Sequence, residues 1–573
     1  MLDKFGVARA LREIGTLLEV KGENPFKVRA YETGARALED SPEDVGALVA
    51  GDRLQELPGV GEALARKIAE LHATGTTPIL ERLRAELPRG ILELVRVPDL
   101  GPKKIAALHA ALGIASLADL EAACRAGRVR GVKGFGEKTE ARILENLARL
   151  ASAEHRVLLA DALELGDKLV RHLRGPPVER LDLAGSARRM KETVADLDLV
   201  ASTRDPAAVA DRLAAFPSVT EVLARGEAKA TVRLATGMQV DLRMVAPEDH
   251  AAALHHLTGS KAHHVKLRGL ARERGFSLSE YGLARLEGGA PVKVESEAAL
   301  YAALGMAFVP PELREDEGEV EAALTGTLPA DLVRAEDVRG MVHCHTLWSD
   351  GRATVEEMAL AAEALGMEYL TITDHSPSAH YAGGLDADRI RRQWDEIDRV
   401  QERVRVKLLK GTESDITEEG GLDFPDAVLE RLDVIVASVH SRFKMDEEAM
   451  TRRLVRALSL PVFKIWGHAL GRLLLERESF ACRVEEVLDA LARSRGAVEV
   501  NGDPHRLELE PRFLRLARQR GIPVVLSVDA HSTAALGYLR YAVGTARRGW
   551  VRRADVLNCL PVEEFARTVR PAA

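Results

Sequence analysis

The sequence lacks the features of a secreted or membrane-spanning protein. Its 573 residues include only four cysteines, which lie far apart and form no CxxC pair (Cys124, Cys344, Cys482 and Cys559). This spacing argues against a disulfide framework or a thiolate zinc site, and it favours a reducing compartment. The opening residues mix charged and apolar side chains, and no later stretch approaches roughly 18 uncharged apolar residues. We therefore expect a cytoplasmic protein without membrane contact.

An excess of basic residues is also missing, because the formal net charge is -8 at pH 7. Whole-chain charge averages over domains, so this value does not exclude nucleic-acid binding by one of them. Most of the acidic excess lies in residues 310–326, PPELREDEGEVEAALTG. Two prolines followed by a run of acids predict an exposed interdomain linker, although a solvated helix face is equally compatible.

The length predicts several domains, since domains usually hold about 100–200 residues each. Residues 1–150 carry apolar positions at helical spacing and should be all-helical. Residues 151–310 contain strand-like runs between helices, which indicates a mixed α/β region. From Gly340, seven apolar strands alternate with amphipathic helices, a pattern typical of a parallel, barrel-like domain.

A degenerate motif recurs three times in the helical region: LPGVGEALARKIAEL from Leu57, VPDLGPKKIAALHAAL from Val97 and VKGFGEKTEARILENL from Val132. Each is a tight glycine turn followed by an amphipathic helix, the form of a helix-hairpin-helix motif. Turn glycines let backbone N–H groups approach a phosphate, so we expect DNA contacts without sequence readout. The expected contact residues are Gly59, Gly61, Lys67, Gly101, Lys103, Gly134, Gly136 and Lys138.

Three acids in the α/β region form the first catalytic candidate. Asp196 and Asp198 alternate along one strand and project to the same side, and a neighbouring strand can bring Asp241 beside them. Clustered carboxylates repel one another unless cations lie between them, so we expect two Mg²⁺ ions there. The preceding Gly185-Ser186 turn and Arg189 can donate hydrogen bonds to a triphosphate.

The order GSxRR, DxD, VDLR and LTGSKAHH resembles the family X nucleotidyltransferases, including polymerase beta, over about residues 1–315. The resemblance implies catalytic Asp196, Asp198 and Asp241, and a nucleotide site formed by Gly185, Ser186, Arg189, Gly259 and His264. The family usually has Tyr-Phe where this chain has His256-Leu257, and Asn in place of His264. The missing aromatic pair predicts weaker discrimination against ribonucleotides. Lys67 matches the family's Schiff-base lysine, with a simple phosphate contact as the alternative.

The second candidate is a set of histidines and acids, nearly all of which end a predicted strand. In α/β barrels the active site lies at the rim formed by the carboxyl ends of the strands. Nitrogen and carboxylate ligands together suit Zn²⁺, Mn²⁺ or Fe²⁺, and the set exceeds what one ion can use, so two or three ions are expected. The candidate ligands are His343, His345, Asp350, His375, Glu413, His440, His468, Asp529 and His531.

This set is similar, residue by residue, to the PHP phosphoesterase family over about residues 340–573, although GHALGR lacks the proline that commonly follows the histidine. The resemblance implies a distorted (β/α)7 barrel with Mn²⁺ or Zn²⁺ ions that activate water for attack on phosphorus. The expected domains are a lyase-like helical domain (1–80), fingers (81–150), a nucleotidyltransferase palm (151–245), a thumb (246–315), a linker (316–339) and the PHP domain (340–573).

Both resemblances together predict a monomeric bacterial DNA polymerase that fills short gaps in base-excision repair. Its substrates would be gapped or primer-template DNA and deoxynucleoside triphosphates. The PHP domain would add a metal-dependent 3′–5′ exonuclease, with incision of abasic sites or removal of 3′-phosphates as further reactions. One alternative is a histidinol-phosphate phosphatase, against which the DNA-binding motifs argue. Another is a noncatalytic DNA-binding scaffold, which predicts incomplete metal-ligand sets.

Overall fold

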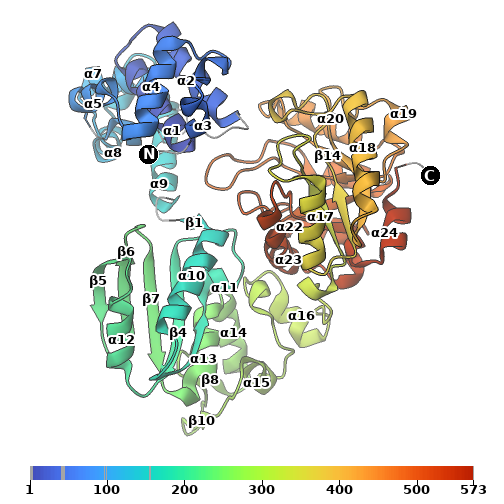
Figure 1. The fold of residues 1–573 in the computed structure, drawn as a ribbon. Helices are drawn as coiled ribbons and strands as arrows, with labels where there is room; N and C mark the ends of the chain where they lie inside the picture. Colours follow the sequence, from blue (N-terminus) through green and yellow to red (C-terminus); the bar gives the residue numbers. More distant parts are fainter. Residues whose placement is uncertain are drawn as a thin grey trace. The chain divides into compact units, whose positions relative to one another are not determined.

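The computed structural model describes residues 4–40, 45–88, 90–95, 97, 100–153 and 156–571. Contacts within the chain divide it into two compact units, Met1–Glu154 and His155–Ala573. Figure 1 shows the ribbon of each unit, and the units are described separately below.

The first unit is all-helical, as the sequence predicts. Its apolar residues recur at helical spacing because one face of each helix packs into a shared core that includes Leu11, Ile68, Leu108 and Leu120. Its elements are α1 (Lys4–Val20), α2 (Pro25–Asp40), α3 (Val45–Ala50), α4 (Glu62–Thr74), α5 (Pro78–Glu86), α6 (Ile91–Leu94), α7 (Pro102–Leu112), α8 (Leu117–Arg125) and α9 (Glu137–Ala153), with short 3-10 turns η1 (Leu54–Glu56) and η2 (Val129–Gly131).

The second unit begins with a five-stranded sheet in the order β2-β4-β7-β6-β5. Its strands are β2 (Val178–Leu183), β4 (Asp196–Thr203), β5 (Val219–Arg225), β6 (Lys229–Leu234) and β7 (Gln239–Val245). The central β4 and β7 run parallel, and the other pairs are antiparallel. Helices α10 (Leu159–Leu173) and α12 (Pro206–Ala214) pack on the sheet and share its apolar core. The short helix α11 (Gly185–Arg188) follows β2.

A smaller subdomain follows the sheet and contains the acidic segment. It comprises α13 (His250–Thr258), α14 (Lys261–Glu273), the antiparallel strands β8 (Phe276–Ser279), β9 (Gly282–Arg285) and β10 (Pro291–Val292), α15 (Glu297–Ala303) and α16 (Glu319–Thr325). Leu313, Val320 and Leu332 belong to its apolar core.

The expectation of an exposed linker over residues 310–326 is therefore wrong for much of the segment. Arg314 and Glu319 are fully buried. Arg314 donates to the Val309 carbonyl at 2.9 Å and forms an ion pair with Glu297, whereas a Glu319 oxygen lies 2.6 Å from Nδ1 of His263. Buried charges persist only when they are paired, and the ionisable partners Glu297 and His263 lie 17 and 56 residues away in sequence. The alternative, a helix with a solvated face, holds for α16, on which Glu321 is exposed.

The last region is a parallel seven-stranded barrel in sequential strand order. All seven predicted strands are present: β11 (Gly340–Cys344), β12 (Tyr369–Ile372), β13 (Lys407–Asp415), β14 (Val434–Ser438), β15 (Lys464–Trp466), β16 (Gly496–Asn501) and β17 (Val524–Ser527). Backbone bonds from Val528 N to Val342 O and from Ala530 N to His343 O join the last strand to the first. The sheet therefore closes on itself. The helices around it are α17 (Val355–Ala364), α18 (Ala387–Gln401), α19 (Asp426–Leu429), α20 (Glu447–Leu458), α21 (Val484–Ala492), α22 (Pro511–Gln519), α23 (Leu539–Arg548) and α24 (Val562–Val569).

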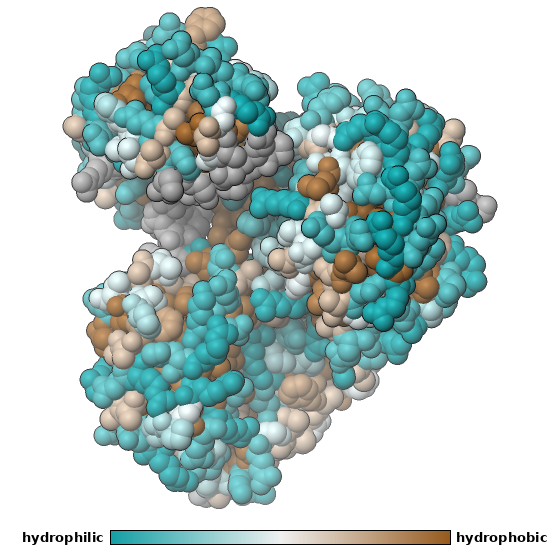
Figure 2. All heavy atoms as spheres, in the orientation of Figure 1, coloured by the Kyte–Doolittle hydropathy of each residue, from teal (hydrophilic) through white to brown (hydrophobic). Residues whose placement is uncertain are grey.

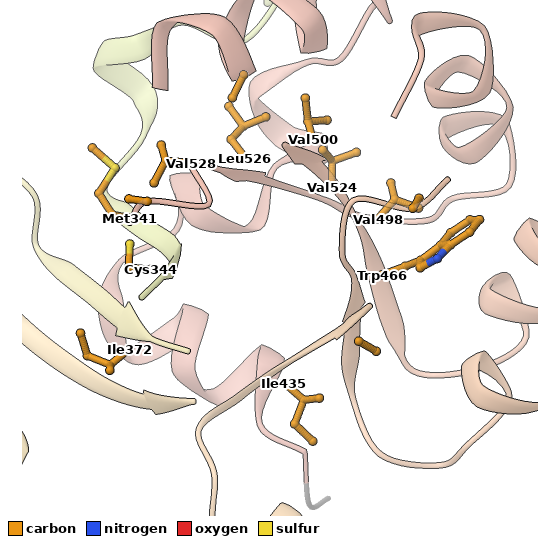
Figure 3. Close-up of a cluster of buried hydrophobic side chains, with 14 of the residues drawn as sticks. Met341, Cys344, Ile372, Ile435, Trp466, Val498, Val500, Val524, Leu526 and Val528 are labelled. Carbon is orange, nitrogen blue, oxygen red and sulfur yellow. The ribbon is translucent and has the colours of Figure 1, made fainter. Parts of the chain in front are cut away.

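Barrel strands are apolar on both faces because side chains alternate between two cores. Met341, Ile435 and Val498 belong to the large cluster shared with the surrounding helices, part of which is drawn in Figure 3. Their neighbours in sequence, such as Val342 and Val434, belong to a separate cluster within the barrel. Figure 2 shows that the visible outer surface of the barrel helices is mostly hydrophilic, as solvent-facing helices require.

The barrel and the five-stranded sheet share apolar contacts inside the second unit. Leu507 from the loop after β16 and Tyr541 from α23 join the core of the sheet region. Next to this contact, Arg548 forms an ion pair with Glu192 at 2.7 Å and is itself 7% exposed. In the described part of the chain no single helix is long and apolar enough to span a membrane, and one bent pair, α7 with α8, passes that test on length and composition alone.

Helix α24 closes the cluster inside the barrel and offers a test of it. Phe565 is fully buried and stacks on Tyr369 with ring centroids 4.7 Å apart. Phe565→Ala should lower the free energy of unfolding by about 3–5 kcal/mol, because it leaves a cavity that the barrel cannot refill. Urea denaturation followed by tryptophan fluorescence measures this, since all four tryptophans lie in residues 340–573. Glu563→Ala on the exposed face of α24 is the control, and equal losses in both variants would contradict the packing account.

Candidate active sites

The barrel brings all nine predicted ligands into one cluster. Four overlapping groups have ligand atoms within 4.8 Å of one another: His345 with Asp350, His375 and His531; His343 with Glu413 and His468; His343 with His345 and Asp529; and His375 with Glu413 and His440. Within the described residues, these are the groups of at least three His, Cys, Asp or Glu side chains that meet this distance. Eight of the nine come from the carboxyl ends of the strands, where a parallel barrel gathers its loops.

Glu413 lies at the centre of the cluster. Its side chain is 1% exposed, and five imidazoles surround its two oxygens. The shortest separation is 2.6 Å, to Nε2 of His468. Nitrogens of the other four lie 3.1–3.5 Å away (His343, His345, His375 and His440). One carboxylate facing five imidazoles is an arrangement that positive charge must stabilise, because burial removes the water that would otherwise do so.

The backbone bends at three of the ligands to aim their side chains. The backbone φ angle is positive at three ligands: 66° at His343, 22° at His468 and 47° at Asp529. Residues other than glycine rarely adopt this conformation. The pairing of β11 with β12 also shifts register between Met341 and Cys344, which marks a bulge or similar irregularity in the stretch that contains His343. Bulges re-aim side chains beside active sites, and such strain persists only where surrounding structure fixes it.

Several buried nitrogens in the cluster have no hydrogen-bond partner in the described part of the chain. They are Nε2 of His343, both ring nitrogens of His345, Nδ1 of His375 and Nδ1 of His468. Burying such groups unpaired costs roughly 1–3 kcal/mol each. Transition-metal ions would satisfy them, and the mixed imidazole and carboxylate donors match the preferences of Zn²⁺ and Mn²⁺. The residues therefore fit a polynuclear metal centre.

Supporting residues that the sequence did not reveal hold the ligands in place. Glu499, fully buried in β16, lies 2.6 Å from Nδ1 of His343, and Asp415 lies 2.8 Å from Nδ1 of His440. Such bonds fix the imidazole tautomer and leave Nε2 for the metal. Nε of Arg506 lies 3.4 Å from Asp529. In the sequence, Glu499 could have been noticed as the charged residue inside the apolar strand sequence AVEVN.

The acidic ligands change the proton affinity of the histidines in the metal-free cluster. Although burial alone would lower it, Glu413 and Asp415 raise the pKa of His440 to about 10. Against the same effect of burial, Asp350 and Asp529 raise the pKa of His531 to about 9. Both imidazoles are therefore protonated at neutral pH without metal, so protons and metal ions compete for the same nitrogens.

The three acids of the five-stranded sheet lie on its central strands. Asp198 of β4 pairs in register with Asp241 of β7, and Asp196 precedes them on the same face of β4. Oδ1 of Asp241 accepts from Thr231 at 2.6 Å and lies 3.2 Å from Nζ of Lys229. Burial, reinforced by the charges of Asp196 and Asp241, raises the pKa of Asp198 to about 7. This electrostatic conflict is the kind that divalent cations relieve, and the all-oxygen donors suit Mg²⁺.

Gly185 directly abuts this site. It has a φ of 63°, and a Cβ there would lie 2.2 Å from Oδ2 of Asp198. The next residue, Ser186, lies in the first turn of α11 and is partly exposed. Nε of Arg189 pairs with Glu315 at 2.8 Å, and its guanidinium also donates to the Thr258 carbonyl. The predicted triphosphate ligand Arg189 is thus held by an acidic partner that sequence reasoning did not find.

The predicted nucleotide residues Gly259 and His264 lie against each other. A Cβ on Gly259 would lie 2.6 Å from Nε2 of His264, and the His264 ring is 5.1 Å from that of His256. Burial, reinforced by His263 and His256, lowers the pKa of His264 to about 3. The imidazole is therefore neutral at physiological pH and can accept or donate one hydrogen bond.

The three glycine turns of the first unit share a backbone hydrogen bond among their described residues. The residue before the last turn glycine is buried, and its N–H donates to the carbonyl at the start of each motif: Val60 N to Leu57 O, Leu100 N to Val97 O and Phe135 N to Val132 O, all at 3.0–3.1 Å. Exposed Gly61, Gly101 and Gly136 then precede α4, α7 and α9, and no atom lies within 4 Å of a Cβ built on them. Gly59 and Gly134 occupy the same place in their motifs with φ of 77° and 92°. In the middle motif, Pro98 and Asp99 lie outside the described residues.

The basic residues predicted to contact DNA follow these turns. Lys103 and Lys138 are exposed in the first turns of α7 and α9. Lys67 lies in the second turn of α4, where its Nζ is 3.2 Å from the Ala63 carbonyl and 5.9 Å from the Tyr31 ring centroid. Exposed backbone N–H groups beside lysines favour phosphate binding, and the DNA-contact assignments remain predictions.

Comparisons with known proteins match all of these regions. Family models match residues 4–77 (helix-hairpin-helix domain), 91–149 (SAM-like helix-hairpin-helix tandem), 253–315 (DNA polymerase beta thumb) and 342–503 (PHP domain). The DNA polymerase/3′–5′ exonuclease PolX of Bacillus subtilis is 36% identical over 98% of both chains. The chain belongs to the family X DNA polymerases with a PHP domain. Such enzymes are metal-dependent, in keeping with the ligand groups described above.

Other relatives match a smaller share of the chain. A probable phosphatase of Thermoanaerobacter is 28% identical over 38% of this chain and 88% of its own length. A probable phosphatase of Caldicellulosiruptor bescii is 29% identical over 34% of this chain and 80% of its own length.

The close approach of Gly185 to Asp198 gives a specific test. Gly185→Ala should reduce nucleotide addition by more than about 100-fold, because its methyl group displaces a carboxylate and strains the turn, whereas hydrolysis at the barrel should be unchanged. Primer extension on a gapped duplex measures the loss. Gly269→Ala, for which no atom lies within 4 Å of the new Cβ, is the control. Normal extension by Gly185→Ala would show that this turn does not shape the site.

The protonated histidines predict that metal binding to the barrel releases protons. Between pH 8 and pH 6, the apparent affinity for Mn²⁺ should fall by about tenfold to a hundredfold per pH unit, since one or two protons must leave. Calorimetric titrations in buffers of different ionisation enthalpy count these protons directly. Asp198→Asn removes the raised pKa at the palm and isolates the barrel signal. An affinity independent of pH over this range would contradict the electrostatics of the cluster.

Proposed function

We propose that this chain is a DNA-directed DNA polymerase that also degrades DNA from the 3′ end. The observation that carries the proposal is that one chain holds two separate sets of candidate ligands, one of carboxylates only and one of histidines with carboxylates. The similarity of nearly the whole chain to a DNA polymerase/3′–5′ exonuclease supports this proposal. Two donor sets of different chemistry are expected for two different reactions.

In the palm, Asp196, Asp198 and Asp241 would bind two Mg²⁺ ions, which supply charge neutralisation for the triphosphate and the 3′-hydroxyl. Gly185 leaves the room that Asp198 needs, and the Gly185-Ser186 turn offers hydrogen-bond donors to phosphate. Arg189 would exchange its bond with Glu315 for one with the incoming triphosphate. Gly259 and neutral His264 would line the nucleotide, where His256-Leu257 leaves a wider sugar pocket than an aromatic pair does.

In the barrel, the nine ligands would hold two or three Mn²⁺ or Zn²⁺ ions, which activate water and neutralise the phosphodiester. Glu499 and Asp415 orient His343 and His440 through hydrogen bonds to Nδ1. Arg506 places a guanidinium beside Asp529, where it can offset the negative charge of the attacked phosphate. Incision of abasic sites and removal of 3′-phosphates are further phosphoester hydrolyses that the same residues can perform.

The glycine turns of the first unit would hold gapped or primer-template DNA by its phosphates, as gap filling in base-excision repair requires. Lys67 serves as a phosphate contact in this scheme, and lyase chemistry at Lys67 is the alternative hypothesis. We place the domains at residues 1–80, 81–150, 151–245, 246–315 and 340–573, with 316–339 joining thumb to barrel, and we propose a cytoplasmic monomer.

The rival functions have less support. A small-molecule phosphatase would use the barrel and resembles the partial relatives, yet it leaves the carboxylate triad and the three glycine turns without a role. A noncatalytic scaffold predicts incomplete ligand sets, whereas the barrel groups all nine candidate ligands and Asp198 pairs in register with Asp241.

Separate substitutions should divide the two activities. Asp198→Asn should reduce extension of a gapped primer by more than about 100-fold and leave 3′–5′ hydrolysis unchanged, whereas His440→Ala should do the reverse. Removing a metal ligand should lower activity by more than the roughly 10–100-fold loss that follows removal of a residue which only hydrogen-bonds to a ligand. Both reactions are read on one labelled duplex, with nucleotides and Mg²⁺ for extension and with Mn²⁺ alone for hydrolysis.

Exposed Glu179→Gln in β2 is the matched control for the palm variant. If a folded His440→Ala protein degrades 3′ ends in Mn²⁺ at the unmodified rate, the hydrolytic site does not lie in the barrel cluster. If Asp198→Asn extends primers at the unmodified rate, the polymerase site does not lie at the three palm acids.

A further inference from the structure

Tyr381 is an exposed aromatic side chain beside the metal-ligand cluster of the barrel. It lies on the 3-10 turn η6 (His380–Ala382) in the loop that follows β12 and the ligand His375. The side chain is 57% exposed in a chain with only 4% aromatic residues. Its hydroxyl has no hydrogen-bond partner among the residues that the structure describes. The ring is therefore free to contact a substrate that reaches the cluster.

The ring stands next to the residues expected to hold the attacked phosphate. Its centroid lies 6.1 Å from the ring of His375 and 6.2 Å from that of His440, with both pairs edge to face. Leu347, two residues after His345 on the adjacent loop, is also 61% exposed. The rim beside the cluster thus offers apolar surface to a substrate, and a phosphate monoester of a small polar alcohol has nothing to place on it.

The loop that carries Tyr381 is fixed rather than free. Leu385 N bonds to the His375 carbonyl at 2.8 Å, so the loop returns to the ligand from which it started. Asp423 accepts hydrogen bonds from Ser376 and Ser378, and Arg389 donates to the carbonyls of Gly383 and Gly384. Ala379 before the turn and Ala382 within it are buried. A ring held in place loses little entropy when a ligand stacks on it.

We propose that Tyr381 is the stacking platform for the 3′-terminal base of the DNA strand that the barrel hydrolyses. This inference rests on the proposed 3′–5′ hydrolysis and adds the feature that selects a nucleobase at the end. In such a reaction the attacked phosphate is the 5′-phosphate of the terminal nucleotide, so that nucleotide's own base lies about one nucleotide length from the cluster. Stacking on an aromatic ring tolerates every base, because each has a π-face. The site would therefore act on any 3′ end that carries a base.

The test compares Tyr381→Leu and Tyr381→Phe on two single-stranded oligonucleotides in Mn²⁺. One ends in an ordinary nucleotide, and the other ends in a tetrahydrofuran analogue that lacks the base. Tyr381→Leu should lower kcat/KM on the ordinary end by about 5- to 100-fold, mainly through KM, because stacking of one base is lost. On the end without a base it should match the unmodified protein. Tyr381→Phe keeps the ring and should retain the unmodified values on both ends.

Tyr281→Leu, at an exposed tyrosine between β8 and β9, is the matched control, and primer extension verifies the fold of each variant. Unchanged kcat/KM for Tyr381→Leu on the ordinary end would overturn the inference, and so would an equal loss on both ends, which indicates a structural role. Failure of the unmodified protein to hydrolyse the ordinary end would instead refute the proposed barrel activity. The two failures are therefore distinguishable.

Discussion

The buried carboxylate of Glu413 is the constraint on which the barrel site depends. It lies near the carboxyl end of β13 and faces five imidazoles, one from β11 and four from the segments that follow β11, β12, β14 and β15. Removing a carboxylate from water is costly unless positive charge replaces the lost hydration. In this cluster the compensation comes from protons on histidine or from metal ions. The supporting acids, Glu499 and Asp415, keep the imidazoles oriented so that metal ions can take that role.

The palm also brings carboxylates close together, but its donor atoms are all oxygens. Its three acids lie on two parallel strands, and Lys229 already approaches one of them. All-oxygen donors suit Mg²⁺, which keeps several waters and leaves room for phosphates, whereas imidazole donors select transition metals. The two regions also touch: a Cβ on Gly544 of α23 would meet the side chain of Met190, the residue that follows Arg189. The barrel therefore supports the turn that carries the proposed triphosphate contacts.

Sequence reasoning reached the elements that local pattern encodes. The seven barrel strands and the convergence of their terminal ligands followed from apolar runs that end in His or Asp. Strand alternation placed Asp196 and Asp198 on one face, whereas the register of Asp198 with Asp241 came only from the structure. Contacts between side chains that are far apart in the sequence could not be predicted. The acidic segment looked like a linker because nothing local shows that Glu319 is buried against His263. The strand β5 has no apolar face for a sequence pattern to reveal because its residues are mostly exposed, and the positive φ values at three ligands cannot be predicted from residue type.

The histidine and carboxylate cluster of the barrel fits a polynuclear transition-metal centre, separate from the palm. Anomalous diffraction from crystals of the full chain grown with Mn²⁺, measured above and below the manganese absorption edge, would locate these ions. We expect two or three anomalous peaks enclosed by the nine ligands, each within about 2.0–2.4 Å of histidine nitrogens and carboxylate oxygens. Full-occupancy manganese elsewhere in the protein, with no peak among these nine side chains, would contradict it.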